Sequence, residues 1–316
     1  MPGSIRASTT PEAWADQPDL SRHARPPDTG TRLRRRVRVR GSPALRAFLR
    51  NRGAAVGAVL VTAWFLLALL APVVAPHDPV AVIAASRQAP GPGHPLGTDL
   101  LGRDVLSRII FGSRISLAIG LISVGIGLTV GTVMGLPSGY YGGRLDTLAM
   151  RLIDAMLAFP GLLLALVVIA ALGPGLANVV LAVGVSSVPL YARLVRGTCL
   201  TVREMDYVQA ARTVGGADLR VMLRHILPNL SGPIIVLSTL QVGSAILVGS
   251  ALSYLGMGAQ PPTPEWGLMT AEGRSYLGSA WWISTFAGLA IFSAVVGINL
   301  VGDGLRAALD PRSRVR

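Results

Sequence analysis

Residues 204–229 read EMDYVQAARTVGGADLRVMLRHILPN, a polar, helix-prone stretch that lies between two long apolar segments. The stretch is too polar to span a membrane. Its pattern predicts one helix that ends at Gly215 and Gly216 and a second that begins at Asp218, an acceptable N-cap residue, before Pro228 marks the end. We therefore expect a helix-turn-helix that lies outside the lipid.

Small side chains within this stretch favour close contact with another protein. Ala210 and Ala211 let a second backbone approach closely, because neither side chain extends beyond a methyl group. Apolar contact area is added by four neighbours: Met205, Tyr207, Val208 and Leu219. We expect a soluble partner to dock here, and an ordinary amphipathic linker between two spans is the alternative.

The composition of the whole chain is that of an integral membrane protein. Apolar residues make up 51% of the sequence and charged residues 14%, and the mean hydropathy is +0.54, values far from those of a soluble domain. Six segments are apolar over about the length that a hydrocarbon layer of roughly 30 Å requires: 54–75, 115–137, 155–172, 176–192, 230–253 and 281–302. Since the apolar run at 161–172 is short, we expect its helix to begin near Thr147. The sequence predicts an all-α protein with six transmembrane helices.

The strongly basic charge reflects topology. The net charge is +13, and the run RLRRRVRVR at 32–40 raises the possibility of nucleic-acid binding. All 29 basic residues are Arg, however, and 24 of them fall in the N-terminus, the loops at 138–153 and 193–224, and the C-terminus. This asymmetry follows the positive-inside rule and predicts that both termini are cytoplasmic. We expect the Arg-rich arm to contact anionic lipid headgroups, with no nucleic-acid partner.

The absence of Lys excludes two kinds of chemistry from this chain. A P-loop needs a Lys on the phosphates, and a Schiff-base enzyme needs a Lys amine. Any ATP hydrolysis must therefore come from a partner, and we expect no catalytic residue and no cofactor in this chain. The single Cys199 excludes an internal disulfide and is expected to be structural. The four histidines never cluster within one span, which argues against a membrane-embedded enzyme: His23, His77, His94 and His225.

The segment at 76–114 predicts a short amphipathic helix on the outer membrane surface. Asp99 and Arg103 are four residues apart with the acid first, as are Asp104 and Arg108. The apolar face would consist of Leu100, Leu101, Val105 and Ile109. A metal site formed by His94, Asp99 and Asp104 is a weaker alternative, because their spacing places them on no common helix face.

Polar residues and prolines in the spans suggest where they meet other helices or water. Asp154 has Arg151 one turn earlier, which favours an interfacial ion pair over a proton relay. Pro160 and Pro189 permit kinks in spans three and four. Span five carries polar or small residues that would line a pathway or form interhelical hydrogen bonds: Ser238, Gln241, Ser244 and Gly249.

The loop QPPTPEWG at 260–267 is rich in proline and precedes Trp281 and Trp282, which suit a membrane interface. A rigid exposed loop of this kind would contact an external protein through four residues: Pro261, Pro262, Glu265 and Trp266.

Together these motifs resemble a known family. The order and spacing of Gln209, Ala210, Ala211, Gly215 and Pro228 resembles the EAA loop of ABC-importer permeases, with Gln209 where the family usually has Glu. Five further stretches look like the C-type permease of dipeptide and oligopeptide importers: HPLGTDLLGRD (94–104), GYYGGRLD (139–146), YARLVR (191–196), QPPTPEWGLM (260–269) and NLVGDGLRAALDPR (299–312). The resemblance covers residues 45–312 and departs from the family at Gly249, where relatives often carry Glu, and at Ala287, where they usually carry Pro.

The resemblance implies a type I ABC-importer permease fold with a cytoplasmic coupling helix, in the bacterial inner membrane. It also implies a homologous B-type permease, two cytoplasmic ATPases that bind ATP and Mg, and an external substrate-binding protein. The residues it assigns to ATPase coupling are Glu204, Tyr207, Gln209, Ala210, Ala211, Gly215, Leu219 and Pro228. The substrate stays open among dipeptides, oligopeptides, nickel chelates, haem and glutathione, and a self-sufficient secondary transporter is the alternative function.

The chain is expected to divide into four parts. Residues 1–41 would form a disordered Arg-rich cytoplasmic tail, and 42–112 the first span with the outer interfacial helix. The permease core of five spans would occupy 113–304, followed by a cytoplasmic tail at 305–316.

Overall fold

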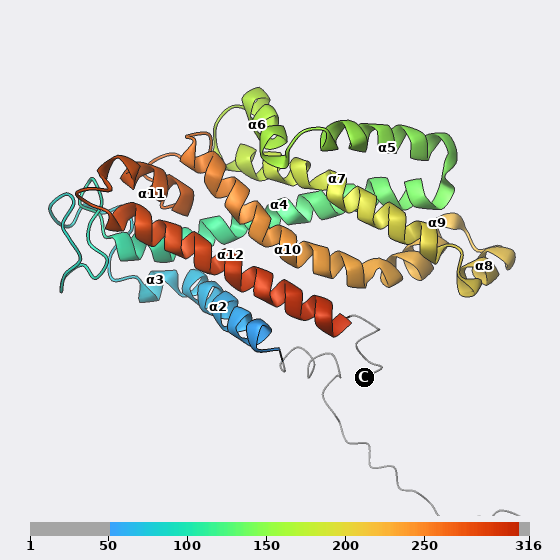
Figure 1. The fold of residues 1–316 in the computed structure, drawn as a ribbon, viewed down its shortest axis with the longest axis horizontal. Helices are drawn as coiled ribbons and strands as arrows, with labels where there is room; N and C mark the ends of the chain where they lie inside the picture. Colours follow the sequence, from blue (N-terminus) through green and yellow to red (C-terminus); the bar gives the residue numbers. More distant parts are fainter. Residues whose placement is uncertain (1–50, 310–316) are drawn as a thin grey trace, which may run out of the picture. The chain divides into compact units, whose positions relative to one another are not determined.

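The computed structural model describes residues 51–309, and no strand occurs among them. The all-α fold expected from the sequence is confirmed, whereas the predictions for the tail at 1–41 and for residues 310–316 lie outside the described residues. The elements are α2 (Arg52–Leu69), α3 (Ala71–Val74), α4 (Val105–Tyr141), α5 (Gly143–Leu157), α6 (Gly161–Leu172), α7 (Leu176–Val202), α8 (Asp206–Thr213), α9 (Asp218–Val221), η2 (Met222–Ile226, a π-helical turn), α10 (Leu227–Tyr254), α11 (Trp266–Gly273), η3 (Arg274–Tyr276) and α12 (Trp282–Leu309). Figure 1 shows their order along the chain.

Five stretches of helix are long and apolar enough to cross a membrane: α2, α4, α7, the continuous stretch from α9 to α10, and α12. The pair α5 and α6 passes the same test together, so the chain has six candidate spans when this bent pair counts as one. This agrees with the six spans expected from the sequence. The last span is longer than predicted, because α12 continues to Leu309.

The third span is not the single helix beginning near Thr147 that the sequence predicted. α5 ends at Leu157, α6 begins at Gly161, and the two helices are bent by 96°. Pro160 occupies the N-cap position of α6 with extended backbone, because a proline in a helix interior removes a hydrogen bond and clashes with the preceding turn. It therefore separates two helices, whereas Pro189 does lie inside α7.

A row of glycines lets α4 pack closely against α7. Gly127, Gly131, Gly135 and Gly139 are four residues apart and so share one helix face. A Cβ added at Gly131 would lie 2.5 Å from the Cβ of Tyr191, and one at Gly135 only 2.4 Å from the Ala192 carbonyl oxygen. Membrane helices use small residues in this way to bring backbones together. The glycine row therefore brings the backbones of α4 and α7 into direct contact.

Helix α7 lies at the centre of the bundle, and α2 lies at its edge. In α7 56% of the most apolar window is buried, against 11% in α2, which leaves most of α2 free to face lipid. Gly57 brings α2 against α12, since a Cβ there would lie 2.7 Å from the Gly297 carbonyl oxygen. The single Cys199 is buried on α7 and is free of any disulfide.

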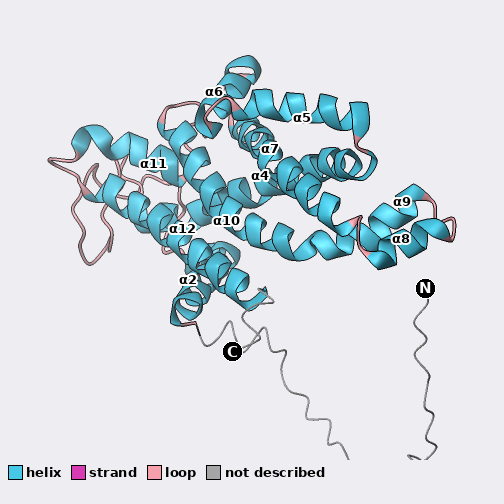
Figure 2. Ribbon diagram, turned by 45° about the vertical axis from the view of Figure 1, so that its right-hand side comes forward, coloured by secondary structure: helices cyan, strands magenta, loops and turns pink. Residues whose placement is uncertain are grey.

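Two ends of the helix bundle carry the non-spanning segments. Residues 76–104 and α11 lie at one, which we call the loop end, and α8 and α9 lie at the other, the hairpin end (Figures 1 and 2).

The amphipathic helix predicted around 99–109 is wrong: residues 99–104 form turns and irregular backbone, and helix begins only at Val105. The reason is that Asp104 caps α4, with its carboxylate accepting a hydrogen bond from the Ser107 N–H at 2.8 Å.

Candidate functional site

The hairpin end presents the helix-turn-helix that the sequence predicted. α8 ends at Thr213 and α9 begins at Asp218, with Gly215 between them at φ +84°, a conformation that glycine adopts without steric cost. Two details of the prediction are wrong. Ala217, and not Asp218, takes the N-cap position, and Pro228 lies in the first turn of α10 instead of ending a helix, since proline is tolerated there.

The hairpin is anchored to three long helices. The Val208 side chain is fully buried, and it packs with Tyr140 of α4, Cys199 of α7 and Leu230 of α10 in one apolar cluster. Tyr140 also donates a hydrogen bond of 2.7 Å to the Asp218 carboxylate, and the Arg212 guanidinium lies 5.3 Å from the centre of the Tyr140 ring. A push on the hairpin would therefore be transmitted to the bundle.

The outer face of the hairpin is open to solvent. Tyr207, Ala210 and Val214 lie three and four residues apart on one side of the helix, and all three are exposed. Gln209 is exposed as well, with its side-chain amide donating to the Arg203 carbonyl oxygen at 3.0 Å. Ala211 is half-buried, and its carbonyl oxygen accepts from the Gly216 N–H at 3.0 Å.

The remaining predicted coupling residues lie at the edges of this face. Glu204 and Gly215 are exposed before and after α8. Leu219 and Pro228 line an apolar groove of 730 Å³ between α4 and the stretch from η2 to α10. The structure thus brings the eight residues to one end of the molecule, while their role in binding an ATPase stays a prediction.

Two arginines at the hairpin end connect α7 to α4 and α5, and sequence reasoning assigned them no role. Arg196 makes a two-pronged ion pair with Asp146, at 2.5 and 2.6 Å, and Ser138 also donates to that carboxylate. Arg203 donates to the Gly139 carbonyl oxygen at 2.8 Å. The motifs GYYGGRLD and YARLVR contain three of these residues, Gly139, Asp146 and Arg196. The opposite charges of Asp146 and Arg196 were the signal in the sequence that could have predicted the ion pair.

Asp154 forms the ion pair expected of it, with a different partner. Its carboxylate lies 2.5 Å from the Arg193 guanidinium of α7, whereas Arg151, the expected partner, forms no ion pair with it in the described part of the chain. Both partners are more than half exposed, so the pair contributes at most about 1 kcal/mol to stability.

The span-five residues predicted to line a pathway have different environments. Ser244 is exposed, Gln241 is half-buried, and Ser238 accepts a hydrogen bond of 3.1 Å from the Tyr191 hydroxyl. Gly249 is buried, and a Cβ added there would lie 2.6 Å from the Ile119 Cγ2. Gly249 is therefore a packing contact between α10 and α4 with no room for a longer side chain, and its pathway role stays a prediction.

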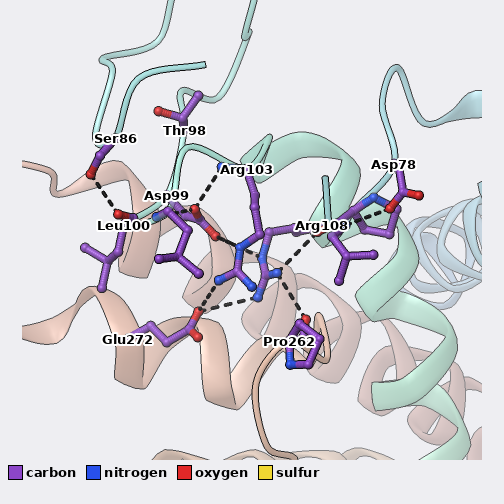
Figure 3. Close-up of polar contacts among 12 residues, drawn as sticks. Asp78, Ser86, Thr98, Asp99, Leu100, Arg103, Arg108, Pro262 and Glu272 are labelled. Carbon is purple, nitrogen blue, oxygen red and sulfur yellow. Dashed lines mark hydrogen bonds and ion pairs between the residues drawn. The ribbon is translucent and has the colours of Figure 1, made fainter. Parts of the chain in front are cut away.

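At the loop end a network of buried charges joins three segments (Figure 3). The Asp99 carboxylate lies 2.5 Å from the Arg103 Nε and 3.4 Å from the Arg108 Nε. Glu272 of α11 lies 3.5 Å from Arg103 and 3.4 Å from Arg108. The predicted Asp99–Arg103 pair is confirmed. The predicted Asp104–Arg108 pair is wrong, because Arg108 turns towards Asp99 and Glu272.

The loop at 260–267 is only partly the exposed surface that the sequence predicted. Pro261 and Pro262 are exposed, but Glu265 and Trp266 are fully buried, so their expected exposure is wrong. Trp266 donates from Nε1 to the Ile109 carbonyl oxygen at 3.0 Å. Glu265 caps α11 by accepting from the Gly267 and Leu268 N–H groups.

Burial raises the pKa of the Glu265 carboxyl above its ordinary value, and the hydrogen bonds from the Gly267 and Leu268 N–H groups oppose that shift. Such a buried acid serves structure, because it holds the start of α11 against α4 and α10 through contacts to Ser116 and Ser250 at 3.4 and 3.5 Å.

The structure brings together a different set of possible metal ligands from the set considered from the sequence. Asp99 is occupied by the arginines, whereas His94 and Asp104 are joined by His77, and the possible ligand atoms of these three all lie within 4.8 Å of one another. Spacing alone missed His77, because the chain between residues 77 and 94 turns back on itself.

Two family models match this chain. Residues 127–315, more than half of the sequence, match the family described as "Binding-protein-dependent transport system inner membrane component". Residues 41–90 match the "N-terminal TM domain of oligopeptide transport permease C". The chain therefore belongs to the family of binding-protein-dependent transport system inner membrane components, which confirms the resemblance seen in its motifs. It is a multi-pass inner-membrane permease component and not an enzyme.

Several similar proteins carry names that concern short peptides. The glutathione transport system permease protein of Pectobacterium atrosepticum is 45% identical, over 84% of this chain and 89% of that protein. The dipeptide transport system permease protein of Haemophilus influenzae is 46% identical, over 84% and 92%. The di/tripeptide transport system permease protein of Pseudomonas aeruginosa is 48% identical, over 84% and 90%. A solved structure of an amino acid ABC transporter is a distant likeness, with a TM-score of 0.49 at 15% identity over 63% of this chain and 92% of that one.

Proposed function

We propose that this chain is the permease subunit of an ATP-driven importer of short peptides. The observation that carries the proposal is the identity of 45–48% to permeases whose names specify dipeptides, di/tripeptides and glutathione. Glutathione is itself a tripeptide, so the chemistry these names share is a short chain with amide bonds and charged termini. Such a substrate is costly to move through lipid, and a path with polar walls between two permease subunits would carry it.

The hairpin end is the proposed docking surface for the ATPases. Exposed residues that offer small and apolar contact area are held on a hairpin that is itself fixed to α4, α7 and α10. Closure of an ATPase pair would then move the hairpin as a rigid lever and tilt the spans between inward-open and outward-open arrangements. Because this chain contains no Lys, and so no P-loop, the ATPase must be another chain.

The proposed orientation places the hairpin end and both termini in the cytoplasm, which the distribution of Arg supports. The loop end then faces outward, where exposed Pro261 and Pro262 would meet an external substrate-binding protein. A homologous second permease would complete the pathway, with exposed Ser244 and half-buried Gln241 of α10 as candidate lining residues of this chain. The Arg-rich N-terminal arm would contact anionic lipid.

The energy source distinguishes this proposal from a self-sufficient secondary transporter. The full set of subunits encoded beside this chain would be reconstituted in liposomes, and uptake of a labelled dipeptide measured with internal ATP or with an imposed proton gradient. Uptake that needs ATP and the ATPase subunits supports the proposal. Uptake by this chain alone, driven by the ion gradient, would replace it with the secondary transporter.

A further inference from the structure

The Asp104 carboxylate at the loop end lacks a cation of its own. Three carboxylates, those of Asp99, Asp104 and Glu272, gather with two guanidiniums, those of Arg103 and Arg108, in this region. Both arginines pair with Asp99 and Glu272. Asp104, whose side chain is 0% exposed, lies within ion-pair distance only of histidines among the described residues.

One oxygen of Asp104 is satisfied and the other is not. Oδ2 accepts from the Ser107 N–H at 2.8 Å and from the Ser107 hydroxyl at 2.7 Å. Oδ1 is buried and has no hydrogen-bond partner in the described part of the chain. The N-terminus of α4 offsets part of the negative charge, but a buried acceptor left without a partner destabilises the fold.

Two imidazole nitrogens face this carboxylate. His94 Nδ1 lies 3.4 Å from Asp104 Oδ1, and His77 Nδ1 lies 3.9 Å from Asp104 Oδ2. Both nitrogens are buried, and neither has a hydrogen-bond partner among residues 51–309. Three unpartnered atoms of the types that bind metals thus converge on one point, while the His77 and His94 rings lie 5.4 Å apart between centroids.

The backbone holds these side chains in place. His94 exchanges hydrogen bonds of 3.0 and 3.1 Å with Gly91. The His77 N–H donates to the Ser107 hydroxyl at 3.0 Å, and that hydroxyl in turn donates to Asp104. Ser107 therefore acts as the outer contact that orients a ligating carboxylate, the arrangement common around protein metal sites.

We propose that His77, His94 and Asp104 form a binding site for a divalent transition metal ion of the Zn²⁺ type. Ligands about 2.0–2.2 Å from a tetrahedral Zn²⁺ lie roughly 3.4 Å from one another, which is the separation of His94 Nδ1 and Asp104 Oδ1. His77, 34% exposed, has room to turn its ring and close the remaining gap. Two imidazoles and one carboxylate suit Zn²⁺ better than Ca²⁺ or Mg²⁺, which prefer oxygen ligands.

A bound metal ion would explain why His77, His94 and Asp104 converge without hydrogen bonds to one another, whereas protonated histidines would not. Protonating both histidines would place two cations beside one carboxylate, and 3.9 Å is too long for a hydrogen bond from His77. A bound metal ion takes both imidazoles in their neutral form and supplies the missing charge to Asp104. It would tie the segment after α3, the turn at 91–94 and the start of α4 together, with its fourth position open to water.

The test is metal binding by the intact protein, purified through a tag without histidine and stripped with a chelator. Zn²⁺ content after dialysis would be measured for the wild type, for His77→Gln and His94→Gln, and for the control His225→Gln, which alters a histidine at the hairpin end. We expect one more Zn²⁺ per chain in the wild type and the control than in the two cluster variants. Equal Zn²⁺ content in all four proteins overturns the proposal.

A second measurement needs no variant and holds even if the cluster variants fail to fold. Co²⁺ added to the stripped wild-type protein should give the intense visible absorption of a four-coordinate site, and Zn²⁺ should abolish it. Zn²⁺ should also raise the midpoint of thermal unfolding by a few degrees. The absence of the Co²⁺ spectrum, or an unfolding midpoint that does not change with Zn²⁺, would overturn the proposal.

Discussion

Tyr140, the penultimate residue of α4, donates a hydrogen bond of 2.7 Å to the carboxylate of Asp218 in the first turn of α9. This contact joins α4, a candidate span of 37 residues, to the hairpin proposed to receive the ATPases. Tyr140 is buried, whereas Asp218 is exposed, so the contact lies at the border between the packed bundle and solvent.

Replacing Tyr140 by Phe removes this hydrogen bond and keeps the ring that packs under Arg212. A hydrogen bond to a charged group contributes about 1.5–3 kcal/mol, and the exposure of Asp218 favours the lower end. We expect Tyr140→Phe to insert normally but to lower ATP-driven uptake several-fold. The matched control is Tyr254→Phe at the other end of the bundle, which should transport as the wild type does. Equal uptake by both variants would mean that the contact does not transmit motion.

Glycines of α4 differ in what they face, which allows a paired test on one helix. A Cβ at Gly131 would meet the Tyr191 Cβ and the backbone of α7, whereas a Cβ at Gly125 would meet nothing within 4 Å. We expect Gly131→Ala to lower stability by about 1–3 kcal/mol through overpacking. Gly125→Ala should be neutral or slightly stabilising. The midpoint of thermal unfolding in detergent measures both, and equal midpoints would contradict the close packing of α4 on α7.

The two acids of the buried charge network should not be equivalent. Asp99 is 2% exposed, approaches both arginines and accepts from the Leu101 and Arg103 N–H groups, while Glu272 is 17% exposed and lies 3.4–3.5 Å from the same arginines. Removing one partner of a buried pair costs about 3–5 kcal/mol. Asp99→Asn should therefore destabilise the protein more than Glu272→Gln does. The reverse order of unfolding midpoints would contradict this assignment.

Glu265 should make stability depend on pH. Because burial raises its pKa in the folded protein, the folded state binds more protons than the unfolded state between the ordinary pKa of Glu and the raised value. Stability should fall as pH rises through that window. Glu265→Gln, which titrates no longer, should flatten this part of the profile of unfolding midpoint against pH. An unchanged profile in the variant would show that Glu265 is not the group responsible.

Much of the fold could be predicted from the sequence, because lipid imposes simple rules. Long apolar segments and the glycines between α8 and α9 led to the right helices and turn. The prediction failed where tertiary contacts decide. Pro160 broke span three, and Asp104 served as a cap and not as the partner of Arg108, which no periodicity reveals.

In the candidate sites, too, some features could be predicted from the sequence and others depend on tertiary contacts. The hairpin residues could be named from their spacing, since a surface segment between two spans reveals its exposure through polarity. The burial of Glu265 and Trp266, and the approach of His77 to Asp104, depend on how the loop at 76–104 turns and on how α11 packs against α4. Neither can be read from the neighbouring residues alone.

The proposed ATPase contact is tested most directly by ATP-dependent uptake of a labelled dipeptide into liposomes that contain the complete importer. Ala210→Arg would place a long charged side chain on the exposed face of α8 without altering a buried residue, and Ala89→Arg adds the same charge at the exposed loop end as the control. We predict that Ala210→Arg abolishes uptake and releases the ATPase subunits, while Ala89→Arg retains them. Full uptake with the ATPase still bound to Ala210→Arg would contradict it.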